Sequence, residues 1–279
     1  MPHFVHKNIG ETPLEALERF RAAQMASGSV HSDGRSFDDL PMTYAGRLDP
    51  MAEGVLVILV GEECKDKQKY LSLNKTYEVE VVFGISTDTH DALGLASIKS
   101  SSLSDNVADI ETPMDPGQCR FIGKDKKVAV LSKPLTFMQK YPAYSSMTIG
   151  GVQLHQLARR GQLPDSPDGM PEKGVTIYSI CELGRRVVSD LDLLQVITER
   201  VALVRGDFRQ KEIIERWRSI LVQPQNRTGR REGFEIVSIR VECSSGTYMR
   251  SLADRMGIEA GTGAFALSIR RTCISPIIL

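Results

Sequence analysis

The chain has 279 residues, of which 41% are hydrophobic and 25% are charged, so it is a globular protein long enough to bury a core. Its 35 basic and 35 acidic side chains give no net charge, which disfavours a nonspecific nucleic-acid binder but allows a local basic stripe. Five scattered cysteines favour reduced thiols in a cytoplasmic protein. A signal peptide, an apolar run of membrane-spanning length and a Cys/His zinc spacing are all lacking. We therefore expect a cytoplasmic protein that binds neither a membrane nor a metal.

A helix start signal stands near the beginning of the chain. Thr12 is suited to cap the helix, a proline follows it, and Glu15 completes a capping box. Apolar residues then recur at helical spacing to about Met25, and the apolar run over 55–60 predicts a buried strand. The other expected elements are a short helix over 65–73, strands over 77–83 and 175–180, helices over 191–204 and 210–221, a strand over 234–243 and a helix over 248–256.

The segments between these elements are polar. Residues 26–39 are rich in Gly and Ser, residues 97–117 are rich in Ser, Asp and Pro, and residues 223–233 form a basic stretch, so each is expected to be a surface loop. Strands dispersed among helices indicate an α/β (α+β) fold. We expect a mixed, largely antiparallel central sheet flanked by helices and loops.

One carboxylate, Asp49, lies in a Gly- and Pro-bounded turn directly before the apolar run over 55–60. A turn that leads into a buried strand can hold a single acid rigidly in a cleft. The turn alone leaves two interpretations open, because an Asp before a proline commonly caps the local backbone. Glu53 is the nearest other acid, and a solvated surface position explains it equally well.

Five further blocks of polar, aromatic and glycine residues are spread along the chain. They are K-N-I-G-E-T from Lys7, K-T-Y and T-D-T-H-D-A-L-G up to Gly94, Y-P-A-Y-S-S and A-R-R-G up to Gly161, V-T-I-Y from Val175, and C-S-S-G-T-Y-M-R-S-L and R-R-T up to Thr272. Together with G-R-L-D-P-M-A-E-G-V-L around Asp49, they resemble the motifs of TruB-type tRNA pseudouridine synthases, in the same order. The resemblance covers most of the chain and implies the pseudouridine synthase fold.

The resemblance also implies roles for individual residues. Asp49 matches the family's nucleophile, which attacks the target uridine so that the base can detach, rotate and rejoin the sugar through carbon. Arg250 matches the arginine that pairs with this acid, and an opposite charge favours the ionised carboxylate. Tyr77 matches the aromatic residue that stacks on the flipped base, and Tyr248 matches a second active-site tyrosine. No cofactor is implied, because the reaction is an isomerisation.

The chain departs from the family pattern beside the acid. Tyr44 stands where the family usually has the histidine that fills the gap left by the flipped base, so Tyr44 is expected to fill that gap by stacking. Arg47 replaces a usual threonine and is similar to the arginine of RluA- and RsuA-type synthases, which helps to displace the base. Thr148 and Ser245 stand where the family has lysines, which implies that two phosphate contacts are lost.

The target uridine must be extruded from folded RNA, so stacking aromatics and basic residues are expected along the binding face. We expect one catalytic domain over 1–279, with an RNA-gripping thumb about 133–162 and an extended insertion about 184–233, and no C-terminal PUA domain. The residues predicted to bind RNA are Lys140, Tyr144, Arg159, Arg160, Arg270 and Arg271.

The leading prediction is a monomeric pseudouridine synthase that acts on the T-loop uridine of tRNA. One alternative is the same chemistry on another RNA site. A second is an RNA-binding or RNA-folding protein whose catalysis is dispensable, although binding alone would not require Asp49. A hydrolase with an aspartate nucleophile is a weaker alternative, because it needs a second general base that no motif offers.

Overall fold

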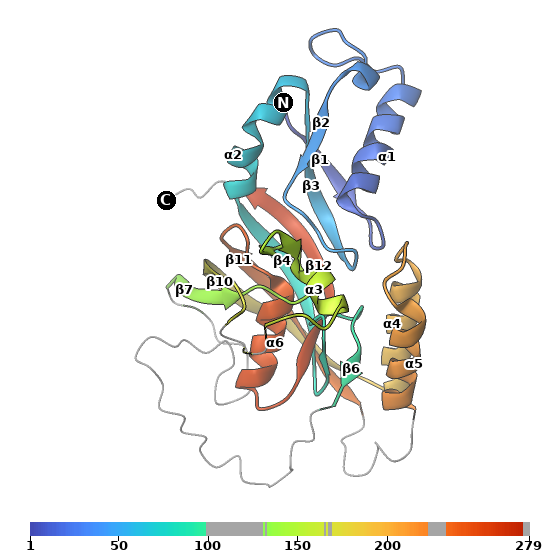
Figure 1. Ribbon diagram of the computed structural model, residues 1–279, viewed down its shortest axis with the longest axis vertical. Coiled ribbons are helices and arrows are strands. Elements are labelled where there is room, and N and C mark those ends of the chain that lie inside the picture. Colours follow the sequence, from blue (N-terminus) through green and yellow to red (C-terminus); the bar gives the residue numbers. More distant parts are fainter. Residues whose placement is uncertain (99–130, 132, 165, 167–168, 223–232, 276–279) are drawn as a thin grey trace.

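The computed structural model describes residues 1–98, 131, 133–164, 166, 169–222 and 233–275. An eight-stranded sheet runs along the length of this part of the chain (Figure 1). Its strands lie in the order β1-β3-β12-β4-β11-β10-β7, and β2 pairs with β3 beside this path. The bounds are β1 His3–Lys7, β2 Met42–Ala45, β3 Ala52–Val60, β4 Asn74–Phe83, β7 Leu135–Lys140, β10 Glu172–Val188, β11 Phe234–Cys243 and β12 Ala264–Ser275.

The pairing within this sheet is largely antiparallel. Strands β12 and β3 run parallel, and the other neighbouring pairs run antiparallel. Helices flank the sheet on both faces, which confirms the expected mixed α/β architecture. The bounds of the larger helices are α1 Pro13–Ala26, α4 Asp190–Ala202, α5 Gln210–Leu221 and α6 Met249–Glu259.

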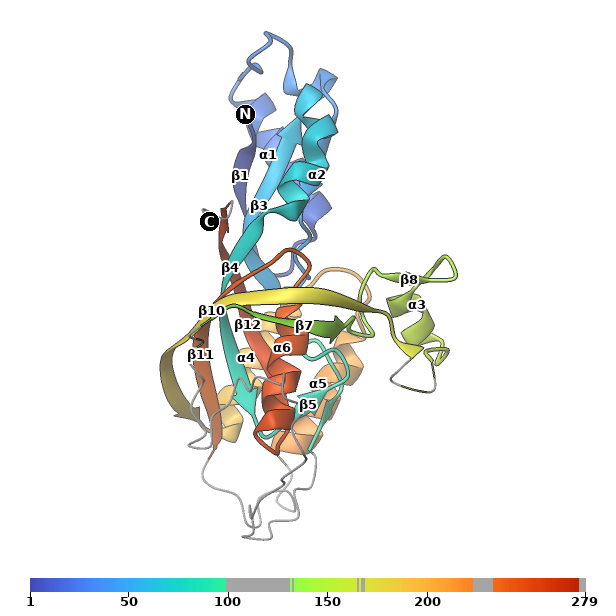
Figure 2. The ribbon, with the colours of Figure 1, turned by 90° about the vertical axis from the view of Figure 1, so that its left-hand side faces the viewer.

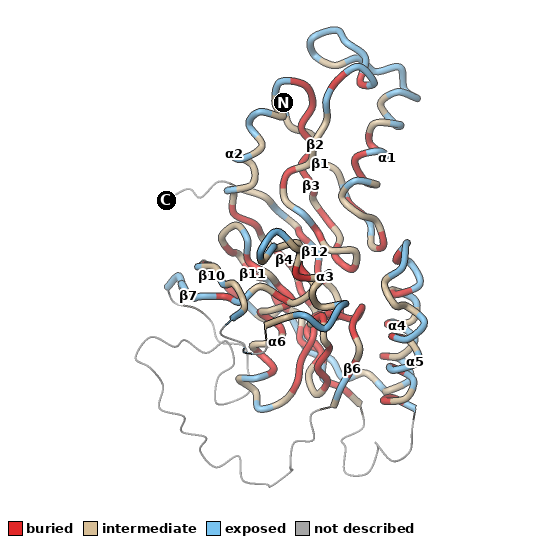
Figure 3. The backbone as a smooth tube through the Cα atoms, viewed as in Figure 1, coloured by how far each residue is buried: buried red, intermediate tan, exposed pale blue. Residues whose placement is uncertain are grey.

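Alternation along the central strands separates two apolar cores. Val81 and Ile239 pack on the face covered by α6, whereas Val82 and Ile236 pack on the face covered by α4 and α5. Because neighbouring side chains of a strand point to opposite faces, a register slip of one residue would exchange the two sets. The buried positions accordingly concentrate along the middle strands (Figure 3). Both cores therefore fix the register of the strands that carry the site.

The N-terminal part of the chain forms the other end of the sheet and the helices that pack on it. Helix α1 begins as predicted, since the Thr12 side chain accepts a hydrogen bond from the Glu15 backbone and the Glu15 carboxylate accepts one from the Thr12 backbone. Its Leu17 packs against Ile58, while helix α2 (Lys67–Ser72) packs against Val57 on the opposite face. Two 3-10 helices lie nearby, η1 Phe37–Asp39 and η2 Gly61–Asp66.

A long hairpin of β7 and β10 carries a small segment away from the sheet (Figure 2). This segment corresponds to the predicted thumb. It contains β8 Thr148–Ile149, β9 Val152–Gln153 and helix α3 Leu154–Arg159. On the α5 side, the loop after β4 forms a short hairpin of β5 Ser86–Thr87 and β6 Ala96–Ser97.

Several boundaries differ from the sequence prediction. The strand predicted over 175–180 extends over 172–188, because it pairs with β7 at one end and β11 at the other. Helix α6 continues through Gly257 to Glu259, so that glycine does not end it. Strands β1, β2, β7 and β12 were not predicted. The polar stretch over 97–117 and the basic loop over 223–233 lie almost entirely outside the described residues.

Candidate active site

The turn that carries Asp49 is held from the N-terminal strand. The Ala52 backbone donates to the Asp49 carbonyl over 3.0 Å, and the Gly10 backbone donates to Pro50 over 2.8 Å. Lys7, fully buried at the end of β1, donates from Nζ to the Ala52 carbonyl over 2.6 Å. Burial lowers the pKa of Lys7 to about 8, although nearby carboxylates, Asp49 among them, oppose the shift. A buried cation thus helps to fix the start of β3.

Arg271 holds the same turn from the opposite side. Its guanidinium donates to the carbonyl oxygens of Val55 over 2.7 Å, Gly46 over 3.2 Å and Arg47 over 3.3 Å. The prediction that Arg271 contacts RNA is wrong, because the residue is only 1% exposed and its guanidinium bonds the backbone. Strands β12 and β3 approach closely here: a Cβ on Gly54 would lie 2.2 Å from the Arg271 carbonyl oxygen.

Asp49 and Arg250, which are 201 residues apart in sequence, meet beside this turn. Arg250 lies in the first turn of α6, and its Nε donates to Asp49 Oδ2 over 2.8 Å. Its Nη1 donates to the Thr89 carbonyl over 2.8 Å and its Nη2 to the Tyr144 carbonyl over 3.1 Å. The Arg250 side chain is 3% exposed, whereas that of Asp49 is 37% exposed. The arginine is therefore fixed, and the acid remains accessible to a ligand.

A second acid, Asp91, also faces Arg250. Its Oδ2 lies 3.7 Å from Arg250 Nε, and its Oδ1 accepts from Thr89 Oγ1 over 2.6 Å and from the Leu93 backbone over 3.0 Å. Burial raises the pKa of Asp91 to about 6, and the charge of Arg250 opposes that shift. Sequence analysis identified Asp91 only as a motif position. The sequence signal for this role is that Asp91 is a carboxylate in a turn-rich segment whose apolar residues belong to the core.

Aromatic side chains line the space around the acid. Tyr77 is 8% exposed, and burial raises the pKa of its hydroxyl. Burial also raises the pKa of Tyr248 to about 12, with the Asp49 charge adding to the shift. The ring of Tyr248 contacts that of Tyr141 edge to face, with centroids 5.6 Å apart. Both hydroxyls beside Asp49 therefore stay protonated at neutral pH.

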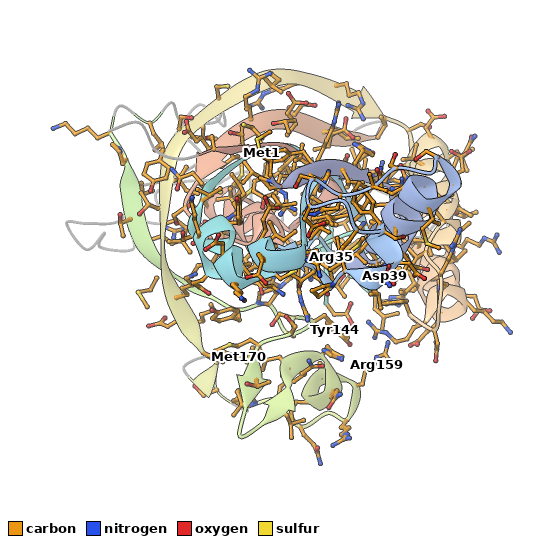
Figure 4. The ribbon with its side chains drawn as sticks, turned by 90° about the horizontal axis from the view of Figure 1, so that it is seen from above. Met1, Arg35, Asp39, Tyr144, Arg159 and Met170 are labelled. Atoms are coloured by element: carbon orange, nitrogen blue, oxygen red, sulfur yellow. The ribbon has the colours of Figure 1, made fainter. Side chains whose placement is uncertain are left out.

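These groups share one cavity of about 770 Å³, a volume within the range of small-ligand sites. Asp49, Tyr77, Tyr248 and Arg250 line it. Figure 4 shows two further lining residues, Tyr144 and Arg159, on the side of the thumb that faces the rest of the molecule. The cavity combines carboxylates, arginines and several aromatic rings, which suits a planar, polar ligand.

The remaining predicted residues divide between this cavity and other surfaces. Tyr44 and Arg47 line the cavity; Arg47 is exposed, and the Tyr44 ring lies 5.4 Å from Lys67 Nζ. Lys140, by contrast, lines a separate hollow of about 440 Å³. Arg160 and Arg270 are exposed and are not among the residues that line either hollow.

Sequence reasoning missed several cavity residues, among them Phe208 and Arg209, which precede helix α5. These two residues belong to no family block, so their sequence carried no signal. Among the described residues, no group of three or more His, Cys, Asp or Glu side chains could hold a metal ion. Within the same ranges, no helix is both long and apolar enough to cross a membrane.

Comparison with known families assigns the chain. The family model described as TruB family pseudouridylate synthase (N terminal domain) matches residues 41–186, slightly more than half of the chain. The chain belongs to the TruB family. The matched range includes Asp49, Tyr77, Asp91 and the whole thumb segment.

Individual relatives agree with this family assignment. The chain is 28% identical to a tRNA pseudouridine synthase B of Xanthomonas axonopodis over 84% of this chain and 54% of that protein. It is also 28% identical to one of Cupriavidus metallidurans, over 98% of this chain and 62% of that protein. The chain thus spans about 54–66% of the first relatives it matches. In a solved Cbf5-Nop10-Gar1 complex it matches one chain with a TM-score of 0.45 and 15% identity, over 97% of this chain and 48% of that one.

Proposed function

We propose that this chain is a tRNA pseudouridine synthase that isomerises a uridine of the T-loop. The observation that carries the proposal is the contact between Asp49 and Arg250, at 2.8 Å, in an aromatic-lined cavity of a TruB-family chain. The named relatives act on tRNA according to their descriptions. Stacking rings and a fixed carboxylate are the groups that recognition and isomerisation of a flipped base require.

Asp49 is the proposed nucleophile. Arg250 donates to one oxygen of the carboxylate and leaves the second oxygen for attack on the nucleoside. In the net reaction the bond from C1′ to N1 of uracil breaks, and a bond from C1′ to C5 forms after the base rotates. The C5 proton is lost and N1 regains one, so no oxidant, reductant or acceptor is consumed. The proposed reaction therefore needs no cofactor.

Tyr77 is proposed to stack on the base during this rotation. Because burial raises its pKa, its hydroxyl is protonated at neutral pH, which favours stacking and hydrogen-bond donation over a role as a base in the resting enzyme. Tyr248, whose pKa burial raises to about 12, is in the same protonation state. The two rings would confine the detached uracil without competing with Asp49 for a proton.

Tyr44 and Arg47 are proposed to share the displacement of the base from the RNA. Both line the cavity beside Asp49, and Arg47 is exposed toward an incoming ligand. Tyr144 and Arg159 on the thumb would contact the RNA next to the flipped nucleotide. Lys140, Arg160 and Arg270 remain proposed contacts outside the cavity. We also retain, as proposals, a monomer in the cytoplasm and a single catalytic domain with the segment about 184–233 as an insertion.

The test is pseudouridine mapping of unmodified tRNA after incubation with the purified chain. The proposal predicts one new pseudouridine, in the T-loop. Pseudouridine at another position would retain the chemistry and reject the T-loop assignment. RNA binding without any pseudouridine would favour the alternative of an RNA-binding protein, and would overturn the proposed activity.

A further inference from the structure

The loop between helices α4 and α5, residues 203–209, is called the tip and lines the same cavity as the thumb. Phe208 and Arg209 of this tip line the cavity together with Tyr144 and Arg159. The tip and the thumb also contact directly, since Arg159 Nη2 donates to the Asp207 carbonyl over 2.9 Å. One wall of the cavity is therefore built from two segments that are far apart in the sequence.

Arg209 has a backbone conformation and a place in the helix cap that are unfavourable for an arginine. Its backbone is left-handed, with φ at 63° and ψ at 26°, a conformation that favours glycine or asparagine. It also stands at the N-cap of α5, where Ser, Thr, Asp or Asn would cap the helix, and its side chain makes no capping hydrogen bond. Among the described non-glycine residues, His90 is the only other one with a positive φ. Local strain of this kind points to a role for the side chain.

The side chain of Arg209 is directed to the cavity wall. Its guanidinium lies 4.8 Å from the centre of the Tyr144 ring, and its Nη2 donates to Asp88 Oδ2 over 3.0 Å. The Arg209 side chain remains 24% exposed. A guanidinium carries five N–H donors, so one bond to Asp88 leaves donors that can meet an anion.

The polar groups around the cavity favour an anion at this wall over one beside Arg250. Asp49 and Asp91 flank the single guanidinium of Arg250 deeper in the site, which disfavours a phosphate there. At the wall, the side chain of Arg209 bonds Asp88, and the Arg209 backbone donates to Asp207 Oδ1 over 3.3 Å. Burial raises the pKa of Tyr144, and Asp88, Arg209 and Arg159 all act on it. The two guanidinium groups keep N–H donors beyond those that they give to Asp88 and to the Asp207 carbonyl, so an anion can bind beside a stacking ring. Arginine next to an aromatic ring is suited to the backbone and base of single-stranded RNA.

We propose that Arg209 is a substrate contact: its guanidinium binds a backbone phosphate of a nucleotide next to the target uridine, while its stacking fixes the Tyr144 ring. This inference rests on the proposed function, because it assumes that the ligand is RNA. It assigns the α4–α5 tip to the RNA-binding face, beside the thumb.

The experiment compares Arg209→Asn with the matched control Arg205→Asn in the full chain. Asparagine suits both the left-handed conformation and the N-cap, so Arg209→Asn should melt within a few degrees of the wild type. Arg205 is a 76%-exposed arginine of the same tip that lies 3.7 Å from Glu15 and is not among the cavity-lining residues. Both variants remove one positive charge. The measurements are the dissociation constant for a T-arm RNA hairpin at several salt concentrations, and pseudouridine formation at saturating RNA.

The proposal predicts that Arg209→Asn weakens binding about tenfold at low salt, the loss expected for one charge-assisted hydrogen bond. The slope of log K against log salt should fall by about 0.7 to 1, as expected for one lost phosphate contact. Arg205→Asn should change binding less than about twofold, because an exposed charge outside the contact is screened. Turnover of the control Arg205→Asn at saturating RNA should stay close to that of the wild type.

Two results would overturn the assignment of Arg209. One is an unchanged salt slope with a fall in turnover, which would mean that Arg209 acts only by positioning Asp88 or Tyr144. The other is an equal loss in both variants, which would mean that net charge alone matters. If the wild type forms pseudouridine and Arg209→Asn binds normally, the inference fails while the proposed function stands. If the wild type binds no RNA, both fail.

Discussion

Replacing Arg250 by methionine should destabilise the protein, because it leaves a buried acid without its cation. Asp91 is 4% exposed, lies 3.7 Å from Arg250 Nε, and would keep only the donors of Thr89 and Leu93. Removing one partner of a buried ion pair costs about 3–5 kcal/mol. For a chain of this size that corresponds to a fall of roughly 6–20 °C in the melting temperature.

The double variant Arg250→Met/Asp91→Asn separates this explanation from a packing defect. Asparagine keeps an acceptor for Thr89 and Leu93 but removes the charge, so the double variant should regain about 1–3 kcal/mol relative to the sum of the two single variants. Pseudouridine formation should not recover, because Asp49 has still lost Arg250. Chemical unfolding of the four proteins in parallel measures this cycle.

The pH dependence of stability is a second test of the Arg250–Asp91 pair. Burial raises the pKa of Asp91 to about 6, above its usual 3.8, so the folded state binds this proton more tightly than the unfolded state does. Asp91 therefore lowers the free energy of unfolding by its full amount above about pH 6. This destabilisation decreases as the pH falls toward 3.8. Without Arg250 the pKa must rise further, so the loss in Arg250→Met should be larger near pH 7.5 than near pH 5.5. A loss that is additive in the cycle and independent of pH would refute the reasoning.

Two further predictions concern the Asp49 turn. Burial lowers the pKa of Lys7 to about 8 from its usual 10.5, so its charge opposes folding below pH 8 and stability from this group rises between pH 8 and 10.5. Lys7→Met should remove this contribution, so the stability of the variant relative to the wild type, measured by urea unfolding, should fall between pH 8 and 10.5; a difference that does not change with pH would contradict the assignment. Arg47→Ala should lower turnover on structured tRNA more than on a short, unstructured RNA, because only the former needs its base displaced, and equal turnover of both RNAs by variant and wild type would reject the role of Arg47.

The elements that the sequence revealed were those with strong local signals. The capping box at Thr12 predicted the start of α1, and strict alternation predicted strands β4 and β11. Strand β12 was not predicted, because Arg270 and Arg271 suggested an exposed basic surface. In the structure only Arg270 of the two is exposed. Burial of an arginine depends on carbonyl oxygens from a distant turn, and local sequence does not show those partners.

The same distinction applies to the site. Family motifs indicated Asp49 and Arg250 as partners, and the structure brings them together. The tip that carries Arg209 lies outside those motifs, and its place in the cavity follows from how α4 and α5 pack on the sheet. Trp217 helps to fix that packing, since its Nε1 donates to the Ala92 carbonyl over 3.3 Å. Such placement is a property of the assembled core, so periodicity along the chain could not predict it.

We propose that Asp49 performs the isomerisation, and tritium release from tRNA labelled at C5 of uridine measures that step. Forming the bond from C5 to C1′ expels the C5 hydrogen, so release counts completed reactions. We expect release by the wild type and none by Asp49→Asn, which keeps the shape of the side chain and should still bind the tRNA. Tritium release by Asp49→Asn at the wild-type rate would contradict it.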